Sequence, residues 1–146
     1  MFSVRSIFFH LEKNSENQEN NLRFTFKKEE RLCSKRLFDQ LFAEGHSFLV
    51  YPLKVVYKET AFSGNYPAKV AFAVRKKIFK SAVRRNRIKR LMRETYRLNK
   101  HWLYRRLGEK RLAIVFIYVG KEQPGYGPME KAMKKGLSKM VAHRPG

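Results

Sequence analysis

The residue pattern with the clearest chemical meaning is a run of basic side chains in the second half of the chain. The 23 residues from Arg75 to Arg97 contain eleven Lys or Arg and a single acid, Glu94. Arg guanidinium groups hydrogen-bond phosphate oxygens in pairs, and Lys adds positive charge. Like charges on a solvated helix repel one another, so a run of one sign favours a polyanionic partner over an ordinary solvated face. The pattern predicts contact with a nucleic-acid backbone.

The spacing of these residues separates the charges from the apolar positions of a helix. When residues from Ser81 to Asn99 are placed 100° apart, the apolar residues share one face. The opposite face carries basic side chains and one amide, and Ala82 beside them is small enough for a phosphate to come close. Asn86 donates and accepts hydrogen bonds, which leaves a base, a 2′-hydroxyl or a main-chain group as its partner. The basic strip consists of Arg85, Asn86, Lys89, Arg90, Arg93 and Arg97, and the apolar face consists of Ile88, Leu91, Met92, Thr95 and Leu98.

Aromatic side chains near basic residues form a second group of candidates, because unpaired bases stack on aromatic rings. Two of them lie one helical turn apart in a short segment, 34–45, that has a helical pattern. Each aromatic taken alone is more often a core residue, since aromatic side chains dominate small cores. The residues therefore leave both roles open. The candidates are Phe38, Phe42, Tyr51, Tyr57 and Tyr96.

The whole chain is strongly basic. Its 146 residues include 33 Lys and Arg against 12 Asp and Glu, which gives a formal net charge of +21. Self-repulsion of this size destabilises an isolated domain, so we expect a polyanion as partner. A membrane anchor needs about 20 continuous apolar residues, and no such run occurs. With no signal-peptide cleavage pattern and a single cysteine, Cys33, the sequence predicts a cytoplasmic protein without membrane contact.

Residues that could perform hydrolysis are not grouped in the sequence. Metal-dependent hydrolysis needs clustered carboxylates, whereas these acids are scattered or surrounded by Lys and Arg. One cysteine without ligand spacing excludes a zinc site. The four histidines share no motif that would pair them for acid–base catalysis. We therefore expect no catalytic residue and no metal ligand in this chain.

The remaining pattern predicts one α+β domain over residues 22–142. The apolar run 112–119 is expected to be the central strand, and 69–74 a strand buried on both faces. Strand, long helix and strand in succession imply a parallel pair joined by a crossover. Residues 1–21 are expected to be a flexible polar extension, and 143–146 a tail. The expected elements are helices over 34–45, 81–99 and 129–140, and strands over 48–58 (broken at Pro52), 69–74 and 112–119.

One motif in the basic run is specific enough to suggest a family. Arg85-Asn86, Lys89-Arg90 and Arg93 have the spacing Arg-Asn-x-x-Lys-Arg-x-x-Arg, and Lys76-Lys77 precedes them. This pattern resembles that of bacterial ribonuclease P proteins, in which it lies on a helix that follows a strand ending in Lys-Lys. The resemblance covers about residues 22–142, and residues 1–21 match nothing in the family pattern.

The resemblance implies a fold and separate functions for the protein subunit and the RNA subunit. Proteins of this family form a two-layer αβββαβα domain with a small mixed sheet, whose βαβ crossover is left-handed against the usual rule. Their catalytic RNA subunit, with bound Mg²⁺, hydrolyses precursor tRNA to remove the 5′ leader. The protein binds the leader and raises the affinity for substrate and Mg²⁺.

The resemblance also assigns sites to residues of this sequence. The leader lies between the first helix and the sheet, which makes Phe38 and Phe42 the stacking residues. The basic helix faces the catalytic RNA. Its expected RNA-binding residues are Lys76, Lys77, Arg85, Asn86, Lys89, Arg90, Arg93 and Arg97.

Three other functions compete with this one. A structural RNA-binding protein, such as a ribosomal protein, would have the same composition, and only the motif spacing and the Phe pair favour ribonuclease P. A DNA-binding regulator would need more base-reading residues on its helix and a preceding helix in helix-turn-helix spacing. An enzyme with its own chemistry lacks a candidate site.

Overall fold

A four-stranded sheet organises the fold, with strand order β1-β2-β4-β3. The computed structural model describes residues 26–62 and 64–142, so the expected extension 1–21 and tail 143–146 lie outside the described residues. β1 pairs with β2 and β2 with β4 in antiparallel fashion, and β3 pairs with β4 in parallel. The expected parallel pair and the central position of 112–119 are confirmed. The strands are β1 (His46–Val50), β2 (Leu53–Glu59), β3 (Ala68–Val74) and β4 (Leu112–Tyr118).

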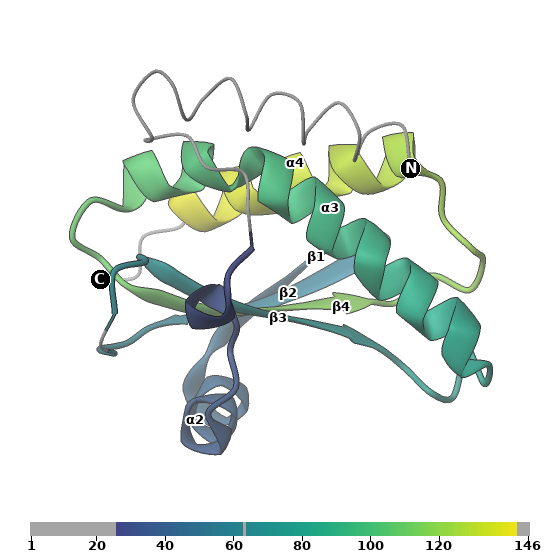
Figure 1. The fold of residues 1–146 in the computed structure, drawn as a ribbon, viewed down its shortest axis with the longest axis horizontal. Coiled ribbons are helices and arrows are strands. Elements are labelled where there is room, and N and C mark those ends of the chain that lie inside the picture. The colour runs from purple at the N-terminus through teal and green to yellow at the C-terminus, as the bar shows by residue number, and fades with distance from the viewer. Residues whose placement is uncertain (1–25, 63, 143–146) are drawn as a thin grey trace.

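The helices cover the two faces of the sheet unequally. Helix α2 (Lys35–Glu44) lies alone on one face, and α3 (Ala82–Leu107) and α4 (Tyr126–Ala142) cover the other (Figure 1). A short 3-10 turn, η1 (Lys28–Glu30), precedes α2. The αβββαβα order and the mixed sheet of the α+β class are therefore as predicted. None of the helices in the described ranges is long and apolar enough to cross a membrane.

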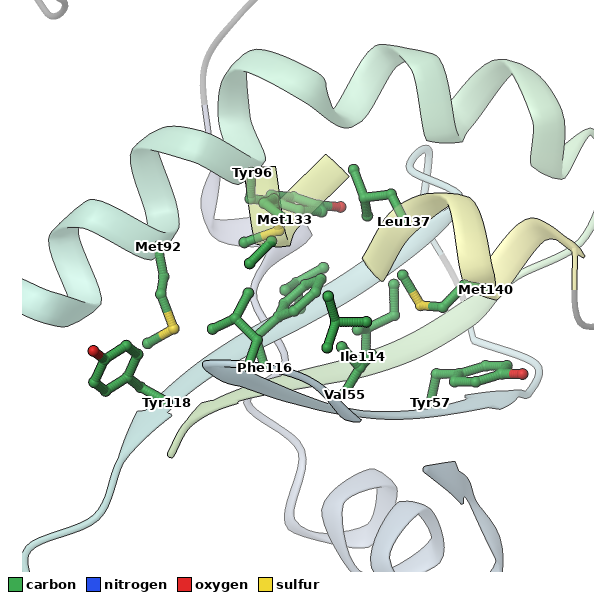
Figure 2. Close-up of a cluster of buried hydrophobic side chains, with 14 of the residues drawn as sticks. Val55, Tyr57, Met92, Tyr96, Ile114, Phe116, Tyr118, Met133, Leu137 and Met140 are labelled. Carbon is green, nitrogen blue, oxygen red and sulfur yellow. The ribbon is translucent and has the colours of Figure 1, made fainter. Parts of the chain in front are cut away.

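The core lies mainly between the sheet and the pair α3 and α4. Side chains from both helices meet the sheet there (Figure 2), with Phe116 of β4 fully buried among them. A smaller cluster lies under α2, where Leu37 and Leu41 pack on Val56 and Val115. Successive strand residues point to opposite faces, which explains why β2 and β4 contribute to both clusters.

Two predicted helices and one predicted strand differ from the structure. Helix α3 continues beyond 99 to Leu107, because Leu103 and Leu107 extend its buried face, and Gly108, with a φ of 60°, caps its C-terminus. Helix α4 begins at Tyr126 rather than Met129, with Pro128 in its first turn, where its lack of an N–H has no cost. The expectation that 69–74 is buried on both faces is wrong. β3 is an edge strand, and within that range only Val70 is buried.

A buried ion pair connects the start of the described chain to α3. Lys100 Nζ lies 2.6 Å from Glu30 Oε1, and the Tyr104 hydroxyl donates to the same oxygen at 2.7 Å. Burial lowers the pKa of Lys100, which Glu30 partly opposes, and burial raises the pKa of Tyr104. Just after η1, Leu32 N donates to Val70 O at the β3 edge. This pair therefore anchors the segment that crosses from the α3 side of the sheet to the α2 side.

Candidate nucleic-acid interface

Helix α3 presents the basic strip on the side opposite the core. Ser81 caps the helix by accepting a hydrogen bond from Arg84 N at 3.4 Å. Ile88 and Met92 are fully buried, whereas Asn86, Arg90 and Arg93 are exposed. The helix therefore separates apolar and cationic side chains as the spacing predicts. Lys76 and Lys77 are also exposed, in the loop between β3 and α3.

Arg85 contacts the main chain of the loop before α3. Its Nη1 donates to Phe79 O at 2.7 Å and to Lys80 O at 2.9 Å, and the side chain is half-buried. The guanidinium of Arg84, a residue that was not predicted, lies over the Phe79 ring at 5.4 Å. These contacts fix the loop that carries Lys76 and Lys77 against the start of α3.

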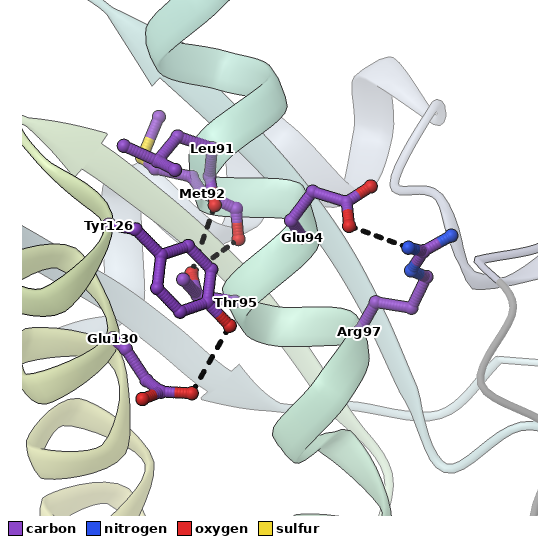
Figure 3. A network of polar contacts seen from close by, with 7 residues as sticks. All are labelled: Leu91, Met92, Glu94, Thr95, Arg97, Tyr126 and Glu130. Carbon is purple, nitrogen blue, oxygen red and sulfur yellow. Dashed lines mark hydrogen bonds and ion pairs between the residues drawn. The ribbon is translucent and has the colours of Figure 1, made fainter. Parts of the chain in front are cut away.

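Arg97 also has a protein partner. Its Nη2 lies 2.6 Å from Glu94 Oε2, and this carboxylate is buried (Figure 3). The acid therefore offsets the Arg97 charge at the end of the strip. Among the residues that the structure describes, no carboxylate forms an ion pair with Arg90.

The inner side of α3 next to this ion pair is closed by internal hydrogen bonds. The hydroxyl of Thr95 donates to Met92 O at 2.9 Å, which lets a polar residue lie on the buried face as predicted (Figure 3). On the neighbouring helix α4, the Tyr126 hydroxyl donates to Glu130 at 3.2 Å. Burial, with Glu130 nearby, raises the pKa of Tyr126 to about 12. These hydroxyl groups are engaged in hydrogen bonds within the protein.

The two predicted Phe residues of helix α2 differ in solvent exposure. The rings of Phe38 and Phe42 are nearly parallel, with an interplanar angle of 8° and centroids 6.5 Å apart. Phe38 is half-buried against the cluster under α2, whereas Phe42 is 58% exposed. Phe42 therefore offers an exposed ring, and the Phe38 ring lies nearly parallel to it.

The other aromatic candidates divide clearly by burial. Tyr57 and Tyr96 are core residues, with 2% and 0% of their surface exposed, so the structure does not support a stacking role for them. Tyr51 is 69% exposed, in the turn between β1 and β2. It lies on a different part of the surface from Phe42, at one end of the sheet.

The sheet face next to α2 carries a row of partly exposed side chains that the sequence alone did not indicate. Leu49 pairs with Lys54, Lys54 with Ile117, and Ile117 with Ala73. On each strand, the residue two positions away belongs to another row of register partners, which runs from Ser47 to Ala71 and lies under α2. Side chains two positions apart on a strand point to the same face, so these four residues also lie on the α2 side. None of the four is fully buried, and Leu49 is 57% exposed. We call these four residues the sheet strip; they are Leu49, Lys54, Ile117 and Ala73.

The sheet strip and the basic loop lie at the same end of the sheet. Val74, the last residue of β3, is the register partner of Tyr118, the last residue of β4. The loop with Lys76 and Lys77 begins directly after Val74, next to the Ala73 end of the strip. The topology therefore joins the apolar surface beside α2 to the cationic surface of α3.

Metal-ligating side chains do not gather in the part of the chain that the structure describes. No three His, Cys, Asp or Glu residues there lie close enough to hold a metal ion. The exposed Cys33 is the free cysteine of this part of the chain.

Comparisons with known proteins identify the family. A sequence profile of the family described as Ribonuclease P matches residues 26–141. The ribonuclease P protein component of Porphyromonas gingivalis is 40% identical over 124 residues, which cover 84% of this chain and 90% of that protein. The component from Chlorobium phaeobacteroides is 39% identical, covering 66% of this chain and 73% of that protein.

Solved structures agree with the sequence relatives. The ribonuclease P protein from Thermotoga maritima superposes with a TM-score of 0.61 at 27% identity, covering 75% of this chain and 96% of that one. The Staphylococcus aureus protein, at 20% identity, shares the fold with a TM-score of 0.62 and covers 76% of this chain and 94% of that one. The chain therefore belongs to the bacterial ribonuclease P protein family, the protein component of the ribonucleoprotein endoribonuclease of tRNA processing.

Proposed function

We propose that this protein binds two RNAs with two separate surfaces. The basic strip of α3, with Lys76 and Lys77, contacts the catalytic RNA of ribonuclease P. Phe42, Phe38 and the sheet strip hold the single-stranded 5′ leader of precursor tRNA. The observation that carries the proposal is the contrast between these surfaces, since one is cationic and the other is aromatic and aliphatic, on opposite faces of one sheet.

The α3 surface is suited to a folded RNA backbone. Arg90 and Arg93 are exposed on a helix whose other side is fixed in the core, so little main-chain ordering is needed to present them. Arg forks pair with phosphate oxygens without reading sequence, which fits a surface that recognises the shape of an RNA. Asn86, exposed in the same strip, adds one group that can recognise a 2′-hydroxyl or a base edge.

The α2 surface is suited to unpaired nucleotides. Bases of any type stack on an exposed ring, so Phe42 provides affinity without strong sequence preference. Leu49 and Ile117 extend the apolar surface across the sheet, and Lys54 between them supplies a charge for a phosphate. Such a surface distinguishes a precursor from mature tRNA, because only the precursor carries a leader.

The chemistry of cleavage is assigned to the RNA partner. The described carboxylates do not form a metal site. We propose that Mg²⁺ is held by the RNA subunit. In this proposal the protein raises the affinity for Mg²⁺ and substrate, and the substrate binds more tightly because phosphates that would otherwise repel each other are neutralised. The proposal also includes a cytoplasmic location and a left-handed βαβ crossover, both of which the family resemblance implies.

Reconstitution with the catalytic RNA tests the function directly. Adding the protein to that RNA and a precursor tRNA at low Mg²⁺ is expected to produce cleavage at the 5′ end of the mature tRNA. The complex is also expected to bind the precursor more tightly than mature tRNA. A protein that binds the RNA but changes neither cleavage nor the preference for the leader would instead be a structural RNA-binding protein.

A further inference from the structure

A lysine-lined groove lies at the end of the sheet where the β1–β2 turn meets α4. It has a volume of about 1150 Å³ and is lined by residues 49–52 at the end of β1 and in that turn, residues 121–125 of the loop after β4, and one side of α4. Tyr51, 69% exposed, stands at its turn side. We call this the lysine groove, and its lysines are Lys121, Lys131, Lys135 and Lys139.

The lysines on α4 are regularly placed. Lys131, Lys135 and Lys139 are four residues apart, so each is about 6 Å from the next along the helix axis. This is close to the separation of neighbouring phosphates in an extended nucleic-acid strand. A helix face with such a repeat of one charge sign repels itself and gains from a polyanion that follows it.

The charges of the groove are largely available for a ligand. Within the described ranges, no carboxylate forms an ion pair with Lys131 or Lys135. Glu122 is the acid among the lining residues, and Lys139 Nζ lies over the Phe48 ring at 5.5 Å. By contrast, Lys134, which is outside the groove on the same helix, lies 3.9 Å from Glu130.

The groove continues the sheet strip. The strip crosses the sheet from Ala73 on β3, beside the basic loop, to Leu49 on the opposite edge strand β1. Leu49 also lines the groove. A strand that enters at the β3 edge and crosses the strip therefore leaves the sheet at the mouth of the groove, where Tyr51 and the lysines are next.

We propose that the lysine groove binds the distal part of the precursor leader, the single-stranded nucleotides 5′ of those on the sheet strip. The lysines contact its phosphates, and Tyr51 stacks on one base. This inference rests on the leader-binding function proposed above. It predicts that long leaders gain affinity from a site that short leaders do not reach.

The test compares holoenzymes on precursor tRNAs that differ only in leader length. One leader is just long enough to cross the sheet strip, and the other extends well beyond it. The double variant K131Q/K135Q should weaken binding of the long-leader precursor by roughly 3- to 10-fold, from two exposed charge contacts. It should lower the salt slope for that substrate by about 1.4, from roughly 0.7 per phosphate contact. The short-leader precursor should bind as it does to the wild type.

A matched control separates the groove from overall charge. The double variant K110Q/K134Q removes the same charge from two exposed lysines outside the groove, and it should leave both substrates unaffected. Tyr51→Ala should likewise weaken only the long-leader precursor.

Other outcomes overturn the inference. Equal weakening for both leaders, or weaker assembly with the catalytic RNA, would place another RNA in the groove. No change in either substrate would leave the groove without an RNA role. Failure of the proposed function itself looks different, because the wild-type holoenzyme would then not distinguish leadered from leaderless tRNA and Phe42→Ala would have no effect.

Discussion

The two RNA contacts proposed above, at the basic strip of α3 and at the surface beside α2, differ in their physical basis. The strip is a set of cations on one continuous helix, and its affinity comes from releasing counterions from a phosphate backbone. The α2 surface combines one helix with four strands, and its affinity comes from stacking and apolar contact. Salt should therefore weaken the first contact strongly and the second only slightly.

The two regions also differ in what holds them. The positions of the exposed cations depend only on α3 itself. Ile88 and Met92, on the apolar side of this helix, fix it in the core. The α2 surface depends on the strand register, since a shift by one residue would turn Lys54 and Ile117 to the other face. Mutations that disturb packing should therefore affect leader binding before they affect binding to the catalytic RNA.

The largest expected effect comes from the ion pair that anchors the chain between the two regions. Glu30→Ala leaves Lys100 without its buried carboxylate, and breaking such a pair typically costs about 3–5 kcal/mol. We expect the free energy of unfolding in urea to fall by about that amount and both RNA contacts to weaken together. The exposed neighbour is the control, since Glu29→Ala should leave stability nearly unchanged. Loss of only one RNA contact in Glu30→Ala would mean that the pair does not support both regions.

The next effect concerns the leader. Phe42→Ala should weaken holoenzyme affinity for a precursor with a leader by about 5- to 150-fold, from 1–3 kcal/mol of stacking per base. Because Phe42 is 58% exposed, the melting temperature of the Phe42→Ala variant should stay close to that of the wild type. Affinities for mature tRNA and for the catalytic RNA should not change. Equal losses for leadered and leaderless substrates would remove Phe42 from the leader site.

Phe38 sharpens the same comparison because it packs under α2 and is also proposed to take part in leader binding. It packs on the cluster under α2 and lies parallel to Phe42. Phe38→Ala should therefore lower the melting temperature more than Phe42→Ala does, and also weaken leader binding. A variant that loses leader binding with no change in melting temperature would show that Phe38 contacts RNA directly rather than supporting Phe42.

A smaller effect is expected for single cations of the strip. Arg90→Ala or Arg93→Ala should reduce the salt slope of binding to the catalytic RNA by roughly 0.7 to 0.9 each, the value for one phosphate contact. The ratio of affinities for leadered and leaderless substrates should stay the same. Arg105→Ala, which removes an exposed charge from the far end of α3, is the control. An unchanged slope in both strip variants would place the RNA contact elsewhere.

The sequence predicted the basic strip of α3 more fully than the surface beside α2, for a physical reason. Helical periodicity places charges on a face by local geometry alone, so the exposed positions of Asn86 and Arg90 could be anticipated. The sheet strip arises only when strands that are distant in sequence align in register, so nothing around Leu49 or Ile117 singles them out. The same limit hid the end of α3, where the charged residue Lys100 interrupts the apolar pattern and is buried only because Glu30 meets it.

The smallest effect on RNA binding is expected for Arg97, although the spacing places it on the same strip as Arg90. Its guanidinium is paired with the buried Glu94, so its charge is already offset within the protein. Arg97→Gln should reduce the salt slope less than Arg90→Gln does. It should lower the melting temperature more, because a buried carboxylate loses its partner. The double variant E94Q/R97Q should recover part of that stability and still bind the catalytic RNA. If Arg97→Gln reduced the salt slope of RNA binding as much as Arg90→Gln does, Arg97 would have to leave Glu94 and contact a phosphate.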